Sequence, residues 1–232
     1  MPFPELAERV ASVRGRIAEA VQRGGHSNQV RLIAVTKTHP VEAVQAVAAA
    51  GILDVGENRV QEALRKQDEL QELGDAPPGL RWHLIGHLQT NKARALPRFV
   101  CFHGLDRAKL AEAAVVVARD ARVTLDVLLQ VNVSREESKG GFTLAELPAE
   151  SERLRRSPEL RVRGVMTLAP FDADESTLRQ VFAGARAALA VVRGAGHDAT
   201  ELSMGMSGDF EVAVEEGATM VRLGTILFGT RS

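Results

Sequence analysis

Tyrosine is absent from this chain of 232 residues, which also has only one tryptophan and one cysteine. The single thiol, Cys101, excludes an internal disulfide and a structural zinc site built on several cysteines, which is typical of a reducing cytoplasm. No apolar run approaches the about 18 residues that a membrane-spanning helix needs, and the charged N-terminal stretch has no apolar signal core. We therefore expect a cytoplasmic protein with no membrane partner.

An excess of either charge is also missing. The chain has 29 Lys and Arg residues against 30 Asp and Glu residues, a net charge of −1, and its isoelectric point is near 6.6. Without a basic excess to neutralise phosphates, a nucleic-acid partner is not expected. Hydrophobic residues make up 45% and charged residues 25% of the chain, which is the balance of an ordinary globular protein.

Short apolar runs, each of the length of a buried parallel strand, occur along the whole chain. Eight are recognised, at residues 31–37, 53–56, 82–86, 99–102, 125–133, 162–168, 202–204 and 220–228. Segments with helical periodicity lie between most of them, at residues 41–50, 60–73, 90–96, 108–119, 144–155, 178–192 and 210–216. A further helical segment precedes the first run, at residues 4–23. The pattern predicts a single (β/α)8 TIM barrel with an extra N-terminal helix.

The alternative is an open, doubly wound sheet. That fold normally has five to seven strands, about two fewer than the runs counted here, and a glycine-rich fingerprint after its first strand. In this chain the first run is followed by Thr38-His39-Pro40 instead. No linker or change in composition divides the chain, so we expect residues 1–232 to form one domain.

The active site of a barrel lies at the C-terminal ends of its strands, so these positions were read for chemistry. Lys37 ends the first apolar run, where partial burial would lower the pKa of its amine and favour Schiff-base chemistry with a carbonyl. The alternative is a lysine whose apolar stem lies along the strand end while its amine reaches water.

An anion site is predicted after the seventh and eighth strands. Ser207 precedes a helical segment and is read as its N-cap, with free backbone N–H groups beside it, although such capping requires no ligand. Gly224 and Thr225 offer further backbone donors in the region where this fold often binds phosphate. Arg222 alternates with apolar neighbours and should face inward, either toward a ligand or toward an ion pair with Glu57 or another carboxylate. An amine, a phosphate cradle and an inward guanidinium together suggest an aldehyde that carries a phosphate.

Other candidates are weaker. His83 and His87 lie on a strand and its following turn, so a zinc pair is not expected, and no metal site is predicted. Cys101 is read as a small core residue. The polar stretch 133–141 is expected to be a loop.

Several motifs are similar to one known family. They are AVTKTHP (34–40), GENRVQEA (56–63), WHLIGHLQTNKAR (82–94), VNVSREESKGGF (131–142), RGVMTLAP (163–170) and LSMGMSGDFEVAVEEGATMVRLGTILFG (202–229). In this order they resemble the pyridoxal phosphate homeostasis proteins over nearly the whole chain. The resemblance implies a barrel similar to the N-terminal domain of bacterial alanine racemase, and pyridoxal 5'-phosphate (PLP) bound as an internal aldimine.

The resemblance also implies roles for single residues. Lys37 matches the aldimine lysine, and Asn58 matches a residue that lines the cofactor. Ser207, Gly224 and Thr225 match the phosphate cradle, and Arg222 matches the partner of the pyridine nitrogen. The chain departs from the family pattern in having threonine where serine is frequent before the lysine, and histidine where lysine is frequent at position 39.

These residues favour a cofactor carrier over an enzyme. An arginine at the pyridine nitrogen weakens PLP as an electron sink, and racemisation needs a second acid–base group that alanine racemase takes from a tyrosine of a second domain, which this chain is expected to lack. We therefore expect a monomeric, non-catalytic PLP carrier or buffer that serves PLP homeostasis and supplies PLP-dependent apoenzymes. A weak PLP-dependent racemase or lyase using His83, Cys101 or water is the main alternative. A regulatory module whose surface changes with PLP occupancy is a third.

Overall fold

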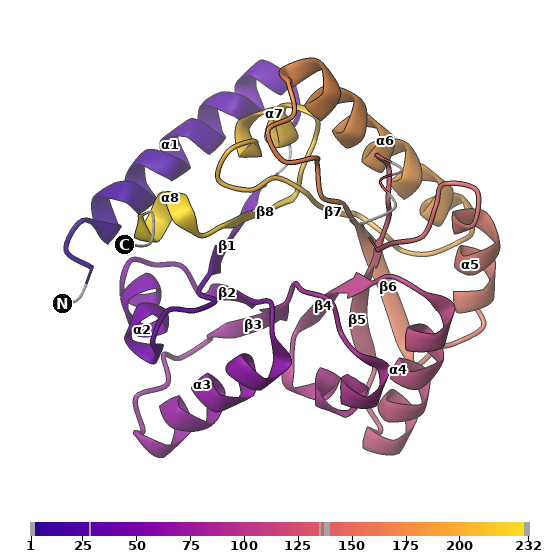
Figure 1. Cartoon of the computed structure of the whole chain (residues 1–232), viewed down its shortest axis with the longest axis horizontal. Helices are drawn as coiled ribbons and strands as arrows, with labels where there is room; N and C mark the ends of the chain where they lie inside the picture. Colours follow the sequence, from indigo (N-terminus) through magenta and orange to yellow (C-terminus); the bar gives the residue numbers. More distant parts are fainter. Residues whose placement is uncertain (1–2, 28, 135, 137–139, 230–232) are drawn as a thin grey trace.

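Eight parallel strands close into a barrel in the computed structural model, each hydrogen-bonded to its neighbours in chain order from β1 round to β8 (Figure 1). The structure describes residues 3–27, 29–134, 136 and 140–229. The predicted closed barrel is thereby confirmed and the open sheet is wrong, because β8 pairs with β1 through Arg31–Met220, Leu32–Val221, Ile33–Arg222 and Ala34–Leu223.

The strands are short, and most are separated by one helix. They are β1 (Arg31–Val35), β2 (Asp54–Glu57), β3 (Arg81–Leu84), β4 (Cys101–Leu105), β5 (Leu125–Gln130), β6 (Leu160–Met166), β7 (Glu201–Ser203) and β8 (Met220–Leu223). The helices are α1 (Leu6–Gly24), α2 (Val41–Ala49), α3 (Val60–Glu72), η1 (Thr90–Arg98), α4 (Ala108–Ala121), α5 (Leu147–Leu154), α6 (Glu175–Gly194), α7 (Phe210–Glu215) and α8 (Thr225–Phe228). Among the described residues, no helix is long and apolar enough to cross a membrane.

Two expected elements differ from those observed. The eighth apolar run was expected to be strand through residue 228, but β8 ends at Leu223 and Thr225 begins the short helix α8. The segment after β3 was expected to be an α-helix and forms the 3-10 helix η1, which contains Pro97. Proline has no N–H to donate and its ring clashes with the preceding turn, so it is not compatible with a regular α-helical interior.

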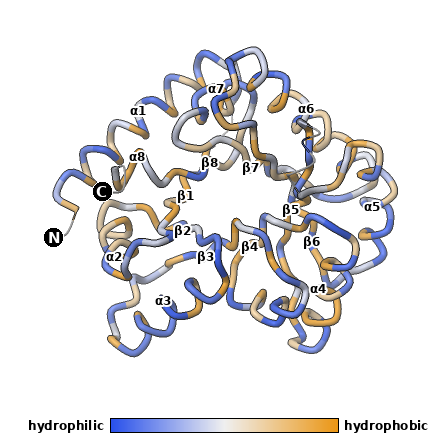
Figure 2. The backbone as a smooth tube through the Cα atoms, viewed as in Figure 1, coloured by the Kyte–Doolittle hydropathy of each residue, from blue (hydrophilic) through white to orange (hydrophobic). Residues whose placement is uncertain are grey.

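Apolar side chains fill two separate regions. The larger core lies between the strands and the surrounding helices and includes the buried faces of α1, α4 and α6 (Figure 2). A smaller cluster is formed by Ile33, Cys101, Leu128, Met166 and Met220. Successive residues of a strand point to opposite faces, so one face of each strand packs on helices while the other lines the barrel interior.

The N-terminal ends of the strands carry ion pairs across neighbouring or nearby strands. They are Arg81–Asp54 and Arg161–Asp126, each at 2.5 Å, and Arg31–Glu201 at 3.6 Å. These charged side chains occupy the end of the barrel opposite to the strand ends from which the catalytic loops of this fold normally arise. The C-terminal rim is thus left as the place for chemistry.

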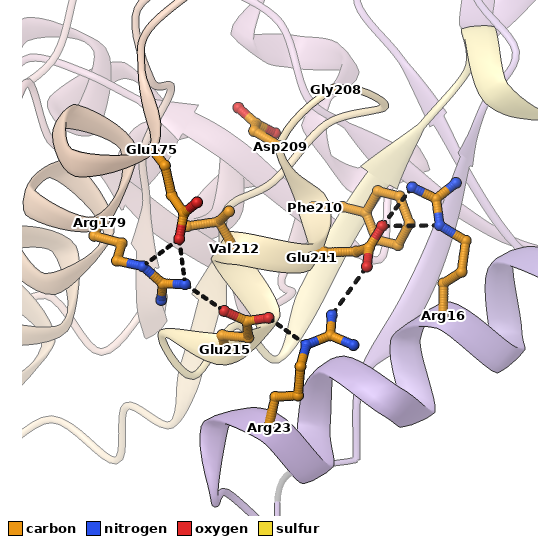
Figure 3. A pocket seen from close by; sticks show the side chains of 10 residues that line it. All are labelled: Arg16, Arg23, Glu175, Arg179, Gly208, Asp209, Phe210, Glu211, Val212 and Glu215. Atoms are coloured by element: carbon orange, nitrogen blue, oxygen red, sulfur yellow. Dashed lines mark hydrogen bonds and ion pairs between the residues drawn. The ribbon is translucent and has the colours of Figure 1, made fainter.

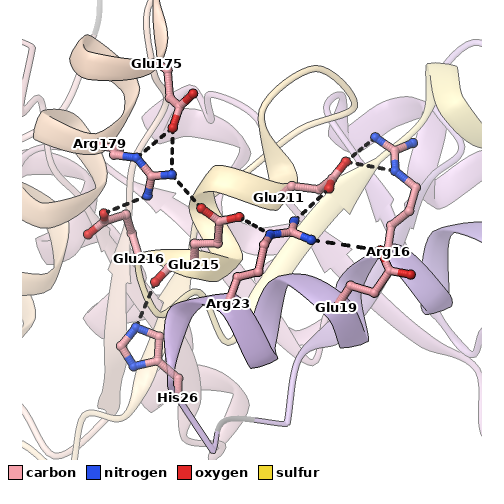
Figure 4. Close-up of polar contacts among 9 residues, drawn as sticks. All are labelled: Arg16, Glu19, Arg23, His26, Glu175, Arg179, Glu211, Glu215 and Glu216. Atoms are coloured by element: carbon pink, nitrogen blue, oxygen red, sulfur yellow. Dashed lines mark hydrogen bonds and ion pairs between the residues drawn. The ribbon is translucent and has the colours of Figure 1, made fainter.

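Helices α1, α6 and α7 are joined by a network of ion pairs (Figure 4). Arg23 of α1 donates to Glu215 of α7 at 2.6 Å and to Glu211 at 2.9 Å. Arg179 of α6 donates to the other oxygen of Glu215 at 2.6 Å, and Arg16 of α1 also pairs with Glu211. Hydrogen bonds from Arg23 and Arg179 hold the pKa of Glu215 below its usual value. The network connects α1 to α6 and α7, which are about 150 residues or more away in the sequence.

A cavity of about 280 Å³ lies among these helices, and Gly208 and Phe210 contribute to its wall (Figure 3). The guanidinium of Arg16 lies over the Phe210 ring, 4.7 Å from its centroid. The arginine and glutamate side chains in its wall pair with one another rather than standing open to a ligand, and Asp209 accepts from the Met206 N–H. We therefore read the cavity as part of the support for α7, which follows the loop that contains Ser207.

Candidate functional site

The side chains predicted from the sequence stand at one rim of the barrel. Lys37 follows β1, Asn58 follows β2, and Arg222 lies in β8. Strand β1 is hydrogen-bonded to both β2 and β8, so these three residues come from adjoining strands. Ser207 lies in the loop between β7 and α7, and the main chain passes from β8 into α8 through Gly224. The strand ends thus bring an amine, a guanidinium and a group of small or hydroxyl residues to neighbouring strands.

Lys37 is half-buried in a turn whose two flanking residues are anchored to the protein. The Thr36 hydroxyl donates to Glu57 Oε1 at 2.7 Å, and the Thr36 carbonyl accepts from Lys66 Nζ at 2.7 Å. On the other side, the Thr38 N–H donates to Glu62 Oε1 at 2.5 Å. Thr38 has a φ of +64°, a left-handed conformation that is strained for a β-branched residue. The turn is therefore held in one geometry by side chains from β2 and α3.

A buried ion cluster lies beneath this turn, and we call Glu57, Glu62 and Lys66 the lysine clamp. Lys66 and Glu57 are both 0% exposed, and Lys66 Nζ lies 2.7 Å from Glu57 Oε1 and 2.9 Å from Glu62 Oε1. Burial raises the pKa of Glu57, although Lys66 and Thr36 oppose that shift. Among the described side chains, Glu57 Oε2 is the one buried polar atom that has no hydrogen-bond partner. Lys66 thus supplies the positive charge that pairs with the carboxylates of both Glu57 and Glu62.

Arg222 is buried and its guanidinium is held by neutral acceptors. It donates to Ser203 Oγ at 2.5 Å and to the Thr167 carbonyl at 2.9 Å. The alternative of an ion pair with Glu57 is wrong, because Glu57 is bonded to Lys66 on the outer side of the sheet. Burial lowers the pKa of Arg222 to about 10, which leaves the guanidinium charged at neutral pH.

The loop after β7 and the start of α8 lie against each other. Ser207 Oγ accepts the Ile226 N–H at 3.2 Å. Reading Ser207 as the N-cap of α7 is wrong, because that position belongs to Asp209. Ser207 is therefore bonded to the start of α8 and does not cap α7, the helix that it precedes.

Backbone N–H groups that could bind a ligand also lie in this region. Within the part of the chain that the structure describes, the backbone N–H groups of Gly208 and Thr225 donate to no protein acceptor. No atom lies within 4 Å of the position that a Cβ on Gly208 would take, so this side of the loop is open. Backbone N–H groups and a serine hydroxyl are the donors that a phosphate group accepts.

Asn58 is positioned by close packing of its backbone on the neighbouring strand end. A Cβ added to Gly86 would lie 2.2 Å from the Asn58 carbonyl oxygen and 2.7 Å from its Cα. Gly104 packs in turn on Gly86, because its Cβ would lie 2.7 Å from the Gly86 oxygen. Residues without side chains at these points let three consecutive strand ends approach one another.

We expect Gly86→Ala to lower the free energy of unfolding by about 1–3 kcal/mol, since the added methyl group must displace backbone atoms of Asn58. Gly15→Ala is the matched control, because Gly15 is exposed in α1 and its Cβ would meet nothing within 4 Å. That control should raise the free energy of unfolding by about 0.5–1 kcal/mol. Urea denaturation of both variants measures the two effects, and equal stabilities would contradict the packing argument.

The weaker candidates from the sequence analysis make packing and hydrogen-bond contacts within the protein. His83 and Cys101 are buried in the barrel interior, and burial raises the pKa of the Cys101 thiol. His87 is exposed and bonded to Asp106 at 2.9 Å. The His39 ring packs on Phe228, with 4.4 Å between the ring centroids. Of the polar loop 133–141, residues 135 and 137–139 lie outside the described residues.

Sequence reasoning missed the residues that support the site. Lys66 shares the buried face of α3 with Val60, Ala63 and Leu70, so a lysine on an apolar helical stripe was the signal available. His103 alternates with Cys101 along β4, and that period of two could have placed both side chains inside the barrel. Nothing in the sequence showed which residues they would meet.

Comparison with known proteins shows which family this chain is similar to. Residues 10–232 match the family described as alanine racemase, N-terminal domain. The pyridoxal phosphate homeostasis protein of Pseudomonas aeruginosa is 44% identical over 97% of this chain and 96% of its own length. The protein of the same name from Aquifex aeolicus is 40% identical over 97% of each chain.

Solved structures give the same picture. The PipY protein of Synechococcus elongatus PCC7942 is 40% identical, covers 97% of this chain and 100% of its own, and has been solved without PLP (TM-score 0.86) and with PLP bound (TM-score 0.84). Alanine racemase from Corynebacterium glutamicum is 19% identical over 97% of this chain and 61% of its own, with a TM-score of 0.73. That last likeness concerns the fold alone.

Proposed function

This chain belongs to the alanine racemase N-terminal domain family and, within it, to the pyridoxal phosphate homeostasis proteins, and from that premise we propose that it binds PLP and serves PLP homeostasis as a carrier or buffer. One observation carries the proposal: Lys37 follows β1 and Arg222 lies in β8, the hydrogen-bonded neighbour of β1, next to the donor-rich Ser207 loop. A PLP-bound relative at 40% identity supports the same ligand.

The residues present fit this cofactor. Lys37 supplies the amine for covalent attachment of an aldehyde. Ser207, Gly224 and Thr225 hold the phosphate, for which the free backbone N–H groups of this region are suited. Arg222 faces the ring nitrogen as a hydrogen-bond donor, and Asn58 lines the ring.

We further propose that the protein has no ordinary catalytic turnover. PLP supplies an electron sink when its ring nitrogen is protonated, which an acidic partner normally favours. Arg222 donates to its partners instead, and its charge disfavours a second positive charge beside it. The chain has no tyrosine, and His83 and Cys101 are both buried, so neither is exposed at the rim to exchange protons with a substrate.

The proposal also covers the domain organisation, the oligomeric state, the compartment and the recipients of PLP. Residues 1–232 act as one PLP-binding domain, and the protein works as a monomer in the cytoplasm. It passes PLP to apoenzymes that need the cofactor. A lone buried thiol, Cys101, accords with a reducing compartment.

Transfer and turnover assays on the PLP-loaded protein test this function. After free PLP is removed by gel filtration, we expect the holoprotein to activate an apo-aminotransferase while converting none of a panel of L- and D-amino acids. Pyridoxal without phosphate is the matched ligand control and should be retained far more weakly, because Ser207 and its neighbours then have no phosphate to bind.

Two results would contradict the proposal. A protein that retains no PLP would overturn the binding function itself. Steady conversion of an amino acid that is lost in Lys37→Ala would overturn only the non-catalytic part and support a racemase or lyase.

A further inference from the structure

A line of hydrogen-bonded side chains crosses the barrel interior and ends at Arg222; we call it the interior relay. Asp54 Oδ1 lies 2.9 Å from His83 Nε2, and His83 Nδ1 lies 3.0 Å from His103 Nε2. His103 Nδ1 lies 2.9 Å from Ser203 Oγ, which accepts from Arg222 at 2.5 Å. All five side chains are buried, with no residue more than 4% exposed. The bond between His103 and Ser203 joins β4 to β7, which are not neighbours in the barrel because β5 and β6 lie between them (Figure 1).

The direction of each hydrogen bond follows from the two ends. Arg222 can only donate, so Ser203 Oγ accepts from it and gives its own hydrogen to His103 Nδ1. His103 then carries its proton on Nε2 and donates to His83 Nδ1. His83 in turn carries its proton on Nε2 and donates to the Asp54 carboxylate. Burial holds the pKa of His103 well below the ordinary histidine value, which favours this neutral form.

The carboxylate at the far end keeps the relay in this direction. Burial alone would raise the pKa of Asp54, but hydrogen bonds from Arg81 and His83 outweigh it and hold the pKa well below its usual range. Arg81 donates to both carboxylate oxygens, at 2.8 Å and 2.5 Å. In the reverse direction, His83 Nε2 would have no proton to donate to the Asp54 carboxylate, and two acceptors would face each other in a buried site, which is unfavourable.

The relay fixes both the place and the charge of Arg222. Its two terminal nitrogens are bound by Ser203 and by the Thr167 carbonyl, which are neutral acceptors. Among the described residues, Arg222 forms no ion pair within 4 Å, and the negative charge that ends the relay is four side chains away at Asp54. The Asp209 carboxylate attracts the guanidinium from a distance, but no described carboxylate is bonded to it, so its positive charge acts on whatever lies beside it at the rim.

We infer that Ser203, His103 and His83 are positioning residues that hold Arg222 as a charged hydrogen-bond donor toward the ring nitrogen of bound PLP. This inference rests on the proposed function for the identity of the ligand. The relay keeps the ring nitrogen unprotonated by opposing a second positive charge there, and it thereby restrains the reactivity of the cofactor that the protein carries.

The same histidines, together with Cys101, are the one group of potential metal ligands in the described part of the chain, with ligand atoms within 4.8 Å of one another. The relay uses both ring nitrogens of His83 and both of His103 for hydrogen bonds. Burial raises the pKa of the Cys101 thiol, which disfavours the thiolate form that binds a metal. Occupation by a metal would need these bonds to break, so the geometry favours the relay.

The first test is made on the apoprotein and needs no cofactor. Long-range ¹⁵N–¹H correlation spectra report which ring nitrogen of each histidine is protonated. We expect both His83 and His103 to be neutral with the proton on Nε2 at pH 7. A proton on Nδ1 of either ring, or a doubly protonated ring, overturns the relay. Uptake of one Zn²⁺ that Cys101→Ala removes also overturns it and assigns a metal site instead.

The second test compares two buried serines in the PLP-loaded protein. Ser203→Ala removes the link between His103 and Arg222, whereas Ser151→Ala removes a hydroxyl that donates to Leu147 in α5, outside the relay. We expect Ser203→Ala to shift the visible absorption maximum of the bound cofactor and to weaken PLP binding between about twofold and tenfold, as for one lost buried hydrogen bond. Ser151→Ala should change neither.

The two tests separate failure of this inference from failure of the proposed function. If PLP binds and Ser203→Ala has the same spectrum and affinity as wild type and Ser151→Ala, the positioning role is overturned while the PLP function stands. If no PLP binds, the proposed function fails and the role of Arg222 toward a ring nitrogen fails with it. The histidine protonation states then still decide whether the relay exists.

Discussion

Lys37→Ala should lose all covalent attachment of PLP. In the wild type we expect borohydride to fix about one pyridoxyl group per chain, because a lysine amine and an aldehyde form a reducible imine. Without the amine, PLP is held by noncovalent contacts alone, so borohydride should fix none and gel filtration should remove most of the ligand. Mass spectrometry of the reduced and digested protein measures the modified residue directly.

Two controls make this result specific. Lys37→Arg keeps the positive charge at the turn but cannot form the imine, so it should behave as Lys37→Ala does. Lys109→Ala changes an exposed lysine of α4 and should label like the wild type. A borohydride-stable group that persists in Lys37→Ala would move the anchor to another lysine and contradict the assignment of Lys37.

Lys66→Met should be the most destabilising of the substitutions considered for this protein. Removing one partner of a buried ion pair leaves an uncompensated charge, which costs about 3–5 kcal/mol. Here the charge left behind belongs to Glu57, whose second oxygen already has no partner among the described residues. Urea denaturation at pH 7 measures the loss, and Lys109→Met is the matched control, expected to fall within about 0.5 kcal/mol of wild type.

A double variant identifies the cause of that loss. Glu57→Gln combined with Lys66→Met removes the unpaired charge but keeps an oxygen to accept from Thr36, so it should be more stable than Lys66→Met alone. Equal stability of the single and double variants would show that lost packing of the Lys66 stem, and not the charge, is responsible. Lys66→Met should also weaken PLP retention, since Lys66 holds the Thr36 carbonyl next to Lys37.

Much of the fold could be predicted from the sequence because its signals are local. The eight apolar runs have the length and composition of buried strands, and the segments between them have helical periodicity. The boundaries were less accurate: β8 ends before Gly224, where the backbone turns into α8 instead of continuing as the apolar run suggested. An apolar run can be strand or helix, and hydrophobicity alone does not distinguish them at this length.

The candidate site was likewise predictable only in part. The inward direction of Arg222 follows from alternation along one strand, and the position of Lys37 follows from the end of one apolar run. The partners of these residues do not follow, and here the sequence interpretation erred. Arg222 binds Ser203 and Thr167 in place of Glu57, and Ser207 accepts from Ile226 in place of capping α7.

The sequence by itself determined the barrel, its order of strands and the residues that stand at its rim, because each of these depends on the periodicity of a few consecutive residues. Tertiary packing decided the rest. Lys66 reaches Thr36 across 30 positions, and His103 reaches Ser203 across 100. The first bond needs α3 packed on the outside of the sheet, and the second needs distant strands to enclose one interior. A buried polar group must then bond to whatever that packing places beside it.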